Sequence, residues 1–163
     1  MKTLLVLRHA KSSWNDPELD DHERPLNDRG RRDGPRMGEL VREYGLIPDV
    51  VISSDAVRAQ LTAEAVAEAA RYAGEILLDP RLYLASPADI VSLLRTVREN
   101  AATVMIIGHN PGFEELVEQL TGERRDLPTA ALAHIVLEID QWCDLTPSTR
   151  GTLVNHWRPK ELR

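Results

Sequence analysis

Two arginines and two histidines follow short apolar runs in this sequence, and side chains of these types can bind and transfer a phosphoryl group. Arg8 and His9 come directly after one run, Arg58 follows a second by about one helical turn, and His109 follows another. Guanidinium groups match phosphoryl oxygens with bidentate, charge-assisted hydrogen bonds. An imidazole is a nucleophile when one ring nitrogen is unprotonated, and a charged donor when both carry protons. The four side chains therefore indicate an anion pocket that contains a candidate nucleophile.

Five runs of β-prone residues predict the strands that must bring these side chains together. One of these runs, residues 133–139, alternates apolar and polar positions, which predicts a strand with one face less buried than the other. The other four are apolar on both sides, as is typical of strands sandwiched between helix layers; they are residues 3–7, 49–53, 76–78 and 103–107. Ligands of open α/β sheets bind at the carboxyl ends of the strands, so the residues after these runs are expected to meet.

Amphipathic stretches between the runs predict helices. Pro35 is expected at or near the start of the first, because an interior proline breaks helical hydrogen bonding, and Gly74 is expected to end the second. Ser86 is the predicted N-cap of the third. The predicted helices cover residues 37–44, 55–72, 86–97 and 111–120. Strands alternating with helices predict a three-layer α/β/α sandwich with a mainly parallel central sheet.

Composition narrows the class of protein. The chain has 163 residues with 20 Lys+Arg against 26 Asp+Glu, a net charge of −6, so we expect a single domain over residues 1–163 and no nucleic-acid partner. Cys143 is the one cysteine, which excludes an internal disulfide framework. The first apolar run is too short for a signal peptide or membrane span, so a cytoplasmic protein without a membrane partner is expected. Nucleotide-cradle and zinc-binding motifs are absent, and we expect neither metal nor cofactor.

Four segments in order resemble the histidine phosphatase superfamily, whose fold is phosphoglycerate-mutase-like. Their residues are Leu7-Arg-His-Ala-Lys-Ser-Ser-Trp-Asn15, Arg24-Pro-Leu-Asn-Asp-Arg-Gly30, Ser53-Ser-Asp-Ala-Val-Arg-Ala-Gln-Leu-Thr-Ala63 and Ile107-Gly-His-Asn-Pro-Gly112. The short chain and the Gly-His-Asn-Pro-Gly form look most like the SixA-type phosphohistidine phosphatases. Two positions depart from the pattern: Ala10 replaces the glycine of the Arg-His-Gly triplet, and Leu61 stands where a polar residue is common.

The resemblance implies a two-step phosphoryl transfer. His9 would attack phosphorus and become phosphohistidine, which water then hydrolyses. The remaining catalytic residues, Arg8, Arg58 and His109, would bind the phosphate and hold its equatorial oxygens. Asn15 is a further phosphate-binding candidate. No metal is required in this scheme, because the arginines supply the positive charge.

The general acid is the open part of this interpretation. Larger family members carry a glutamate after the third strand, whereas residues 79–89 contain none. Asp89 is expected to compensate a helix dipole, and Asp16, Asp20 or Asp21 could supply an acid from the loop after His9. A phosphohistidine leaves as neutral imidazole and needs less acid catalysis than an ester.

The substrate prediction follows from that gap. We expect a phosphoprotein that carries phosphohistidine, and the alternatives are a small phosphorylated metabolite or a phosphate-binding module without turnover. A phosphoglycerate mutase is disfavoured by the absent glutamate. Among other residues, Trp14 is expected at the mouth of the site, His22 on the surface, and His134 and His156 in structural roles.

Overall fold

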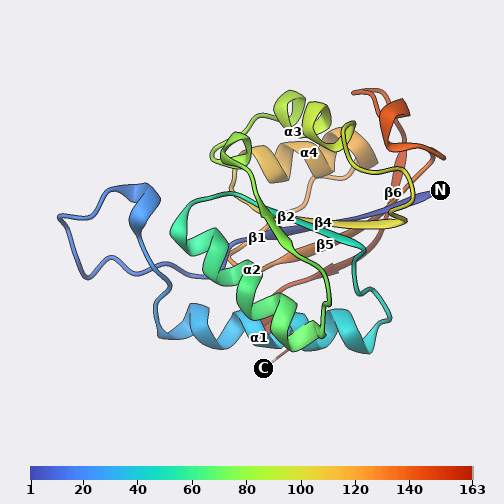
Figure 1. Cartoon of the computed structure of the whole chain (residues 1–163). Coiled ribbons are helices and arrows are strands. Elements are labelled where there is room, and N and C mark those ends of the chain that lie inside the picture. The colour runs from blue at the N-terminus through green and yellow to red at the C-terminus, as the bar shows by residue number, and fades with distance from the viewer. Residues whose placement is uncertain (163) are drawn as a thin grey trace.

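A six-stranded sheet in the order β3-β2-β4-β1-β5-β6 forms the centre of the computed structural model, which describes residues 1–162 (Figure 1). Neighbours are parallel from β3 to β1, whereas β5 is antiparallel to β1 and to β6. The strands are β1 (Lys2–Arg8), β2 (Val50–Ser53), β3 (Ile76–Leu78), β4 (Thr103–Gly108), β5 (Leu132–Leu137) and β6 (Gly151–Trp157). The mainly parallel sheet predicted from the apolar runs is confirmed.

Helices cover both faces of this sheet, which confirms the three-layer α/β/α sandwich. In Figure 1, α1 and α2 lie below the sheet, and α3 and α4 lie above it. The helices are α1 (Asp28–Glu43), α2 (Val57–Ala70), α3 (Pro87–Leu94) and α4 (Gly112–Thr121). Among the described residues, no helix is both long and apolar enough to cross a membrane.

The strands divide the apolar residues between two cores. Along β1, Leu4 and Val6 pack toward α3 and α4, and Leu5 and Leu7 pack toward α1 and α2; all four are fully buried. The same alternation runs along β4. This two-sided burial explains why these strands appear in the sequence as continuous apolar runs.

The chain changes faces between neighbouring strands β1 and β4. The helices that follow β1 and β2 lie on one face, and those that follow β3 and β4 lie on the other (Figure 1). Loops after β1 and β4 therefore diverge to opposite faces and leave a crevice at the carboxyl ends of the two strands. The candidate site residues predicted from the sequence lie at this crevice.

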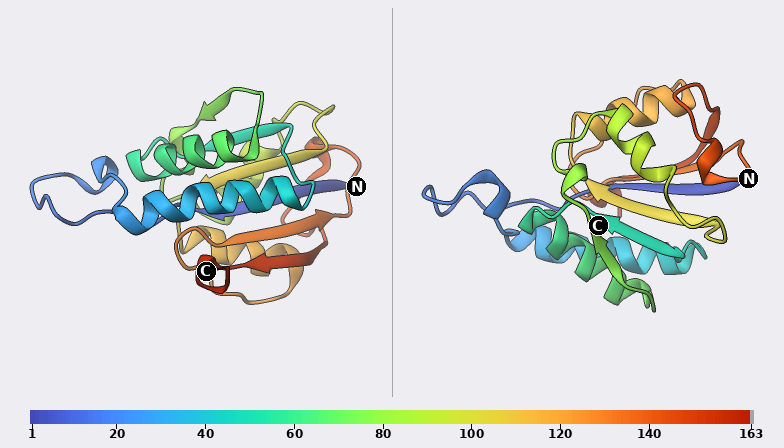
Figure 2. Two further views of the ribbon diagram at one scale, coloured as in Figure 1. Left: turned by 90° about the horizontal axis from the view of Figure 1, so that it is seen from below. Right: turned by 45° about the horizontal axis from the view of Figure 1, so that its top comes forward.

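A long loop projects from the same edge of the sheet. We call this segment, residues 13–25, the excursion loop; both views of Figure 2 show it projecting from the sandwich. At its base, Ser12 pairs with Leu26 in an isolated β-bridge, and the Ser13 N–H donates to the Pro25 carbonyl at 2.8 Å. A short 3₁₀ turn, Asp21–Glu23, brings the loop back toward α2.

Two predicted helix boundaries are wrong. Pro35 lies inside α1, because Asn27 caps the helix earlier by accepting the Gly30 N–H at 2.9 Å. The second is the end of α2, which was predicted at Gly74. The helix ends at Ala70, and the next residue, Arg71, adopts the left-handed conformation (φ 60°) that terminates it. The expected Ser86 cap of α3 is confirmed.

Candidate active site

The four side chains singled out from the sequence share one cavity of about 210 Å³ at the carboxyl ends of β1, β2 and β4. Arg8 ends β1, His9 follows it, His109 follows β4, and Arg58 lies in the first turn of α2. The cavity is lined by Arg8, His9, Lys11, Ser12, Trp14, Asp21, Arg58, Leu84, His109, Asn110 and Thr129. A basic, two-histidine cavity of this size suits a phosphoryl group.

The His9 imidazole presents an unprotonated nitrogen at this cavity. Its Nδ1 lies 2.7 Å from the Ala10 carbonyl oxygen. A carbonyl only accepts, so Nδ1 carries the proton and Nε2 keeps its lone pair. Burial, together with Arg58 and Arg8, lowers the pKa of His9 from 6.5 to about 4. At neutral pH this side chain is therefore a neutral imidazole with a free Nε2, the state of a nucleophile.

His109 is held in the opposite tautomer. Arg58 Nη2 lies 3.3 Å from His109 Nδ1 and donates to it, so the proton of His109 is on Nε2, which lies 2.8 Å from Ser54 Oγ. Burial, then His9 and Arg58, lowers the pKa of His109 to about 3. The two imidazole centroids are 5.2 Å apart. Ser54 therefore anchors the second histidine, from the end of β2.

The Arg58 guanidinium lies between the two histidines and Asp21. Its Nε points at His9 Nε2 from 3.4 Å. Nη1 donates to the Asp21 backbone carbonyl at 2.6 Å, and Nη2 donates to Asp21 Oδ2 at 2.9 Å. The residue is buried, with 5% of its surface exposed. Its charge is therefore fixed beside the candidate nucleophile.

Arg8 contributes a second guanidinium, and part of it has no partner. Its Nη1 donates to the Leu127 carbonyl at 3.1 Å, whereas its buried Nε makes no hydrogen bond among the described residues. Asn110 Nδ2 donates to the same carbonyl at 2.8 Å. Burial lowers the pKa of Arg8 below its ordinary value. An unmet, desolvated donor at a cavity wall suits an anionic ligand.

The structure does not bring Asn15 to the cavity. Asn15 is exposed in the excursion loop, and its N–H donates to Ser13 Oγ at 3.2 Å. Trp14, by contrast, lies at the mouth as expected: it lines the cavity, is 64% exposed, and its ring centroid is 3.4 Å from Arg24 Cζ.

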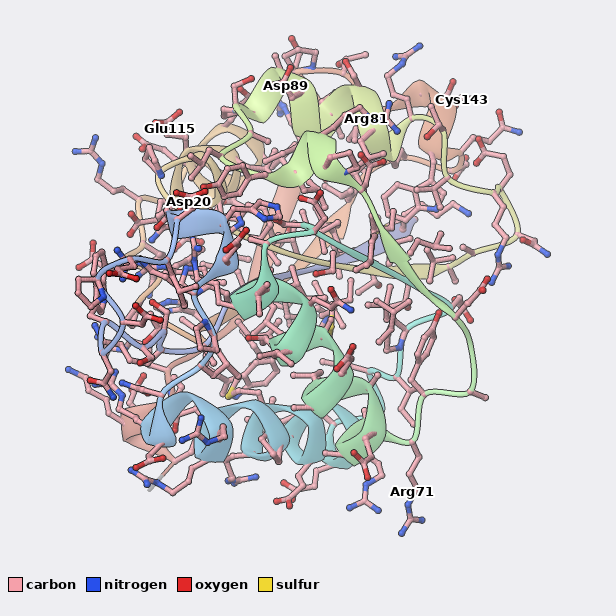
Figure 3. The ribbon with its side chains drawn as sticks, turned by 60° about the vertical axis from the view of Figure 1, so that its left-hand side comes forward. Asp20, Arg71, Arg81, Asp89, Glu115 and Cys143 are labelled. Carbon is pink, nitrogen blue, oxygen red and sulfur yellow. The ribbon has the colours of Figure 1, made fainter. Side chains whose placement is uncertain are left out.

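Of the four candidate acids, Asp21 alone lines the cavity among the described residues. Asp16 and Asp20 are exposed in the excursion loop, where Figure 3 labels Asp20. Asp89, labelled on α3, forms a capping box in which its side chain accepts the Ser86 N–H at 3.3 Å. Hydrogen bonds from Tyr83 and Arg58 lower the pKa of Asp21, so this residue is a carboxylate at neutral pH.

Tyr83 is a neighbour of the site that sequence reasoning missed. Its hydroxyl donates to Asp21 Oδ2 at 2.7 Å, and its ring packs edge-on against His109 with centroids 5.3 Å apart. It follows β3 by a few residues, so the rule that located Arg8 and His109 after their strands would also have indicated it. His22, expected on the surface, is partly buried against Tyr83 and bonds Asp55 at 2.9 Å.

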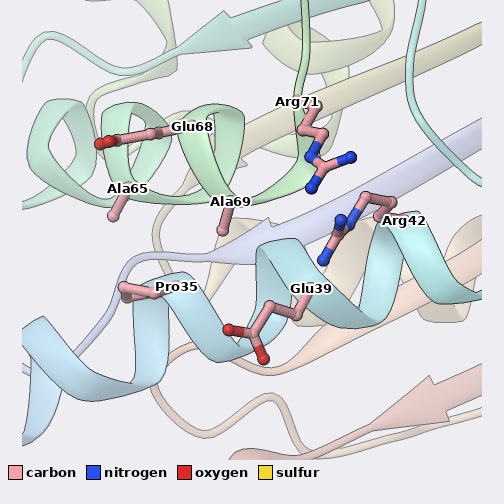
Figure 4. Close-up of a pocket in the computed structure, with 7 residues that line it drawn as sticks. All are labelled: Pro35, Glu39, Arg42, Ala65, Glu68, Ala69 and Arg71. Carbon is pink, nitrogen blue, oxygen red and sulfur yellow. The ribbon is translucent and has the colours of Figure 1, made fainter.

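A larger hollow lies elsewhere and lacks the chemistry of a nucleophilic site. It measures about 480 Å³ between α1 and α2, where Arg42 and Arg71 face each other at one end (Figure 4). Its lining residues are Pro35, Glu39, Arg42, Ala65, Glu68, Ala69 and Arg71. With no histidine, cysteine or hydroxyl side chain in that lining, the cavity at His9 is the better candidate.

Comparisons with known proteins identify the family of the chain. The model of the histidine phosphatase superfamily (branch 1) matches residues 4–83. An uncharacterized chloroplastic protein of Arabidopsis thaliana is 30% identical over 154 residues, which span 86% of this chain and 69% of the relative. The SixA protein of Agrobacterium tumefaciens matches at 27% identity with a TM-score of 0.83, over 97% of this chain and 98% of that one. A protein histidine phosphatase SixA complexed with tungstate matches at 23% identity with a TM-score of 0.85, over 99% of each chain.

The chain belongs to the histidine phosphatase superfamily, and its fold is of the SixA type. The resemblance drawn from the four sequence segments is thereby confirmed. Membership of this superfamily supports a phosphatase-type enzyme.

Proposed function

We propose that this protein hydrolyses phosphohistidine carried by a partner protein, through a covalent phosphohistidine on His9. The observation that carries the proposal is the unprotonated His9 Nε2, which lies 3.4 Å from Nε of the Arg58 guanidinium. Phosphorus held in front of Arg58 would lie on the line of attack of that nitrogen. Arg8, Arg58 and His109 would bind the oxygens on which negative charge spreads in the transition state.

In the first step, His9 Nε2 forms a bond to phosphorus while the bond from phosphorus to the substrate imidazole breaks. The substrate ring leaves neutral, because its other nitrogen already carries a proton. His9 becomes a phosphorylated imidazolium whose Nδ1–H still donates to the Ala10 carbonyl. Nucleophile and leaving group are both imidazoles, so no proton moves and no general acid is needed.

In the second step, water attacks phosphorus and the bond to His9 Nε2 breaks. The electron pair of that bond returns to Nε2, and both water protons stay on the released dihydrogen phosphate. His9 is then neutral again with its proton on Nδ1. His109 would assist as a donor, since the phosphoryl charge raises the pKa of an adjacent imidazole.

The surroundings of Asp21 favour this substrate over an ester. Among the described residues that line the cavity, Asp21 is the one carboxyl group, and its hydrogen bonds from Tyr83 and Arg58 lower its pKa. An alkoxide leaving group needs a positioned proton, which general acids supply with gains of about 10²–10⁴ in rate. A phosphoramidate substrate does not need that proton.

The positive charge that phosphoryl transfer requires comes in this proposal from Arg8 and Arg58. No cluster of three or more metal-ligating side chains was found among residues 1–162. The proposed reaction draws its positive charge from these two arginines, and its partner is the phosphoprotein substrate. Trp14, which is exposed and lines the cavity, would contact that partner.

The test is quenched-flow incubation with a ³²P-phosphohistidine protein, following free phosphate and acid-labile label on this chain. Transient label and phosphate release are expected in the wild type and in His134→Ala, a control outside the cavity. His9→Ala should lose both. Arg58→Ala should lose most of the turnover, and a rate within a few-fold of wild type would contradict the pocket.

The same assay separates the alternatives. Label that forms without turnover would indicate a phosphate-binding module. Faster turnover of a phosphate ester with a poor alkoxide leaving group than of phosphohistidine would indicate a small-molecule phosphatase.

A further inference from the structure

We infer that Asp21 is a positioning residue, which grips one edge of the Arg58 guanidinium and leaves the other edge aimed at the phosphoryl group. This inference rests on the proposed function and assigns a role to a residue that the four-residue site does not include. It also replaces the general-acid role that the sequence left open for Asp21.

The geometry divides the guanidinium into two edges. Nη1 and one N–H of Nη2 are bound by Asp21, through its backbone carbonyl at 2.6 Å and its Oδ2 at 2.9 Å. Nε and the other N–H of Nη2 face His9 Nε2 at 3.4 Å and His109 Nδ1 at 3.3 Å. The Nε–Nη2 edge is one of the two forks by which arginine binds phosphate bidentately. Asp21 thus fixes which fork faces the reacting atoms.

Asp21 is itself held by one residue outside the excursion loop and by one within it. Tyr83, beyond β3, donates its hydroxyl to Asp21 Oδ2 at 2.7 Å, and Arg24 Nε lies 3.7 Å from the other carboxylate oxygen, Oδ1. The Tyr83 ring also contacts His109 edge-on and His22 edge-on. The Asp21 carboxylate, which accepts from both Arg58 and Tyr83, therefore links the excursion loop to the segment after β3.

The charge of Asp21 predicts which kinetic constant it affects. A carboxylate behind Arg58 repels a phosphoryl dianion and cannot tighten its binding directly. Its contribution is orientation, which appears in the transition state, where a misplacement of about 1 Å costs about 100-fold in rate. Loss of the side chain should therefore lower kcat without weakening the binding of inorganic phosphate.

The variants are Asp21→Ala, Asp21→Asn and, as a matched control, Asp20→Asn. Asp20 is the neighbouring exposed carboxylate and does not line the cavity. Single-turnover labelling of His9 is measured with a phosphohistidine protein and with p-nitrophenyl phosphate and phenyl phosphate, and phosphate affinity is measured by calorimetry. Thermal melting verifies that each variant folds.

For Asp21→Ala we expect labelling to slow by about 10- to 100-fold with every donor, with phosphate affinity unchanged or higher. Asp21→Asn keeps an oxygen that accepts from Arg58, so it should recover most of the rate. Asp20→Asn should equal wild type. A loss confined to phenyl phosphate, the donor with the poorest leaving group, would overturn the inference in favour of a general acid, and so would Asp21→Ala labelling at the wild-type rate.

A second readout does not depend on turnover. In wild type, the hydrogen bond that Arg58 Nη2 donates to the Asp21 carboxylate should slow rotation of this Nη group and give separate Nη2 proton resonances in NMR spectra, which should merge in Asp21→Ala. Unchanged Arg58 resonances in that variant would overturn the inference. If the wild type hydrolyses no phosphohistidine, the proposed substrate fails, and the NMR comparison alone decides the role of Asp21.

Discussion

At the scale of single residues, the reactivity of His9 depends on a backbone atom. The Ala10 carbonyl holds the proton on Nδ1, and the Ala10 N–H donates to Thr62 Oγ1 at 2.9 Å. A methyl group at residue 10 alters neither bond, which explains how alanine replaces the glycine of the superfamily triplet. Leu61, the other departure from the superfamily pattern, lies on α2, where it is partly buried against the core, and it does not line the cavity.

The lowered pKa values of His9 and His109 predict how stability changes with pH. The folded protein takes up these protons near pH 4 and 3, whereas the unfolded chain takes them up near the ordinary value of 6.5. Between these values the unfolded state binds more protons, so the free energy of unfolding falls as the pH drops from 6.5 toward 4. Urea unfolding at several pH values in this range measures the slope.

His9→Asn should flatten that slope, because it removes one of the buried imidazoles whose pKa is lowered. His156→Asn is the matched control, since His156 lies outside the cavity and bonds the Asp126 carbonyl. Equal slopes in His9→Asn and wild type would contradict the burial of a neutral His9.

At the scale of elements, α2 and α4 end in the same left-handed conformation with different residues. Arg71 has a φ of 60° at the end of α2, and Gly122 has a φ of 74° at the end of α4. A side chain in this region costs about 1 kcal/mol, which glycine avoids. We expect Arg71→Gly to raise the free energy of unfolding by about 0.5–1 kcal/mol, and Gly122→Ala to lower it by about 1 kcal/mol.

Urea unfolding of the two variants measures both changes. A Cβ at Gly122 would meet no atom within 4 Å, so any loss there reports backbone conformation alone. Arg71→Gly that proved less stable than wild type would refute this account of the α2 terminus.

The sequence predicted elements with strong internal patterns and missed those that depend on neighbours. Continuous apolar runs indicated β1, β2 and β4, which are buried on both sides. β6 was not predicted, because Gly151–Trp157 alternates half-buried and exposed positions and is a strand through pairing with β5. The start of α1 was also predicted wrongly, at Pro35, because the true start depends on neighbouring residues. Asn27 caps α1 ahead of Pro35, and Gly38 packs close to Val66 of α2.

At the scale of the whole molecule, both cores use the same strands. Side chains of β1, β2 and β4 contribute to both cores, so the two helix layers pack on opposite faces of the same strands. We therefore expect residues 1–163 to unfold as one domain in a single cooperative transition. Urea curves from far-UV circular dichroism and from tryptophan fluorescence, to which the fully buried Trp142 contributes, should coincide. Two separate midpoints would indicate two units.

The whole fold also explains which site residues the sequence could indicate. Arg8 ends a strand, and His9 and His109 directly follow strands, so the carboxyl ends of the parallel strands bring them together independently of the loop conformations. The contact of Asp21 with Arg58 depends on the path by which the excursion loop returns to α2, and no local pattern encodes that path. Asn15, expected at the phosphate from its motif position alone, lies in the same loop and away from the cavity.

Arg8 Nε, which meets no acceptor among residues 1–162, links the stability of the protein to its activity. A buried donor without an acceptor costs about 1–3 kcal/mol, so the resting protein is held below the stability that its fold allows. Arg8→Met should melt at a higher temperature and be inert, and millimolar phosphate should raise the melting temperature of wild type but not of the variant. Selection of variants for thermal stability alone would therefore tend to replace Arg8, the residue expected to bind phosphate.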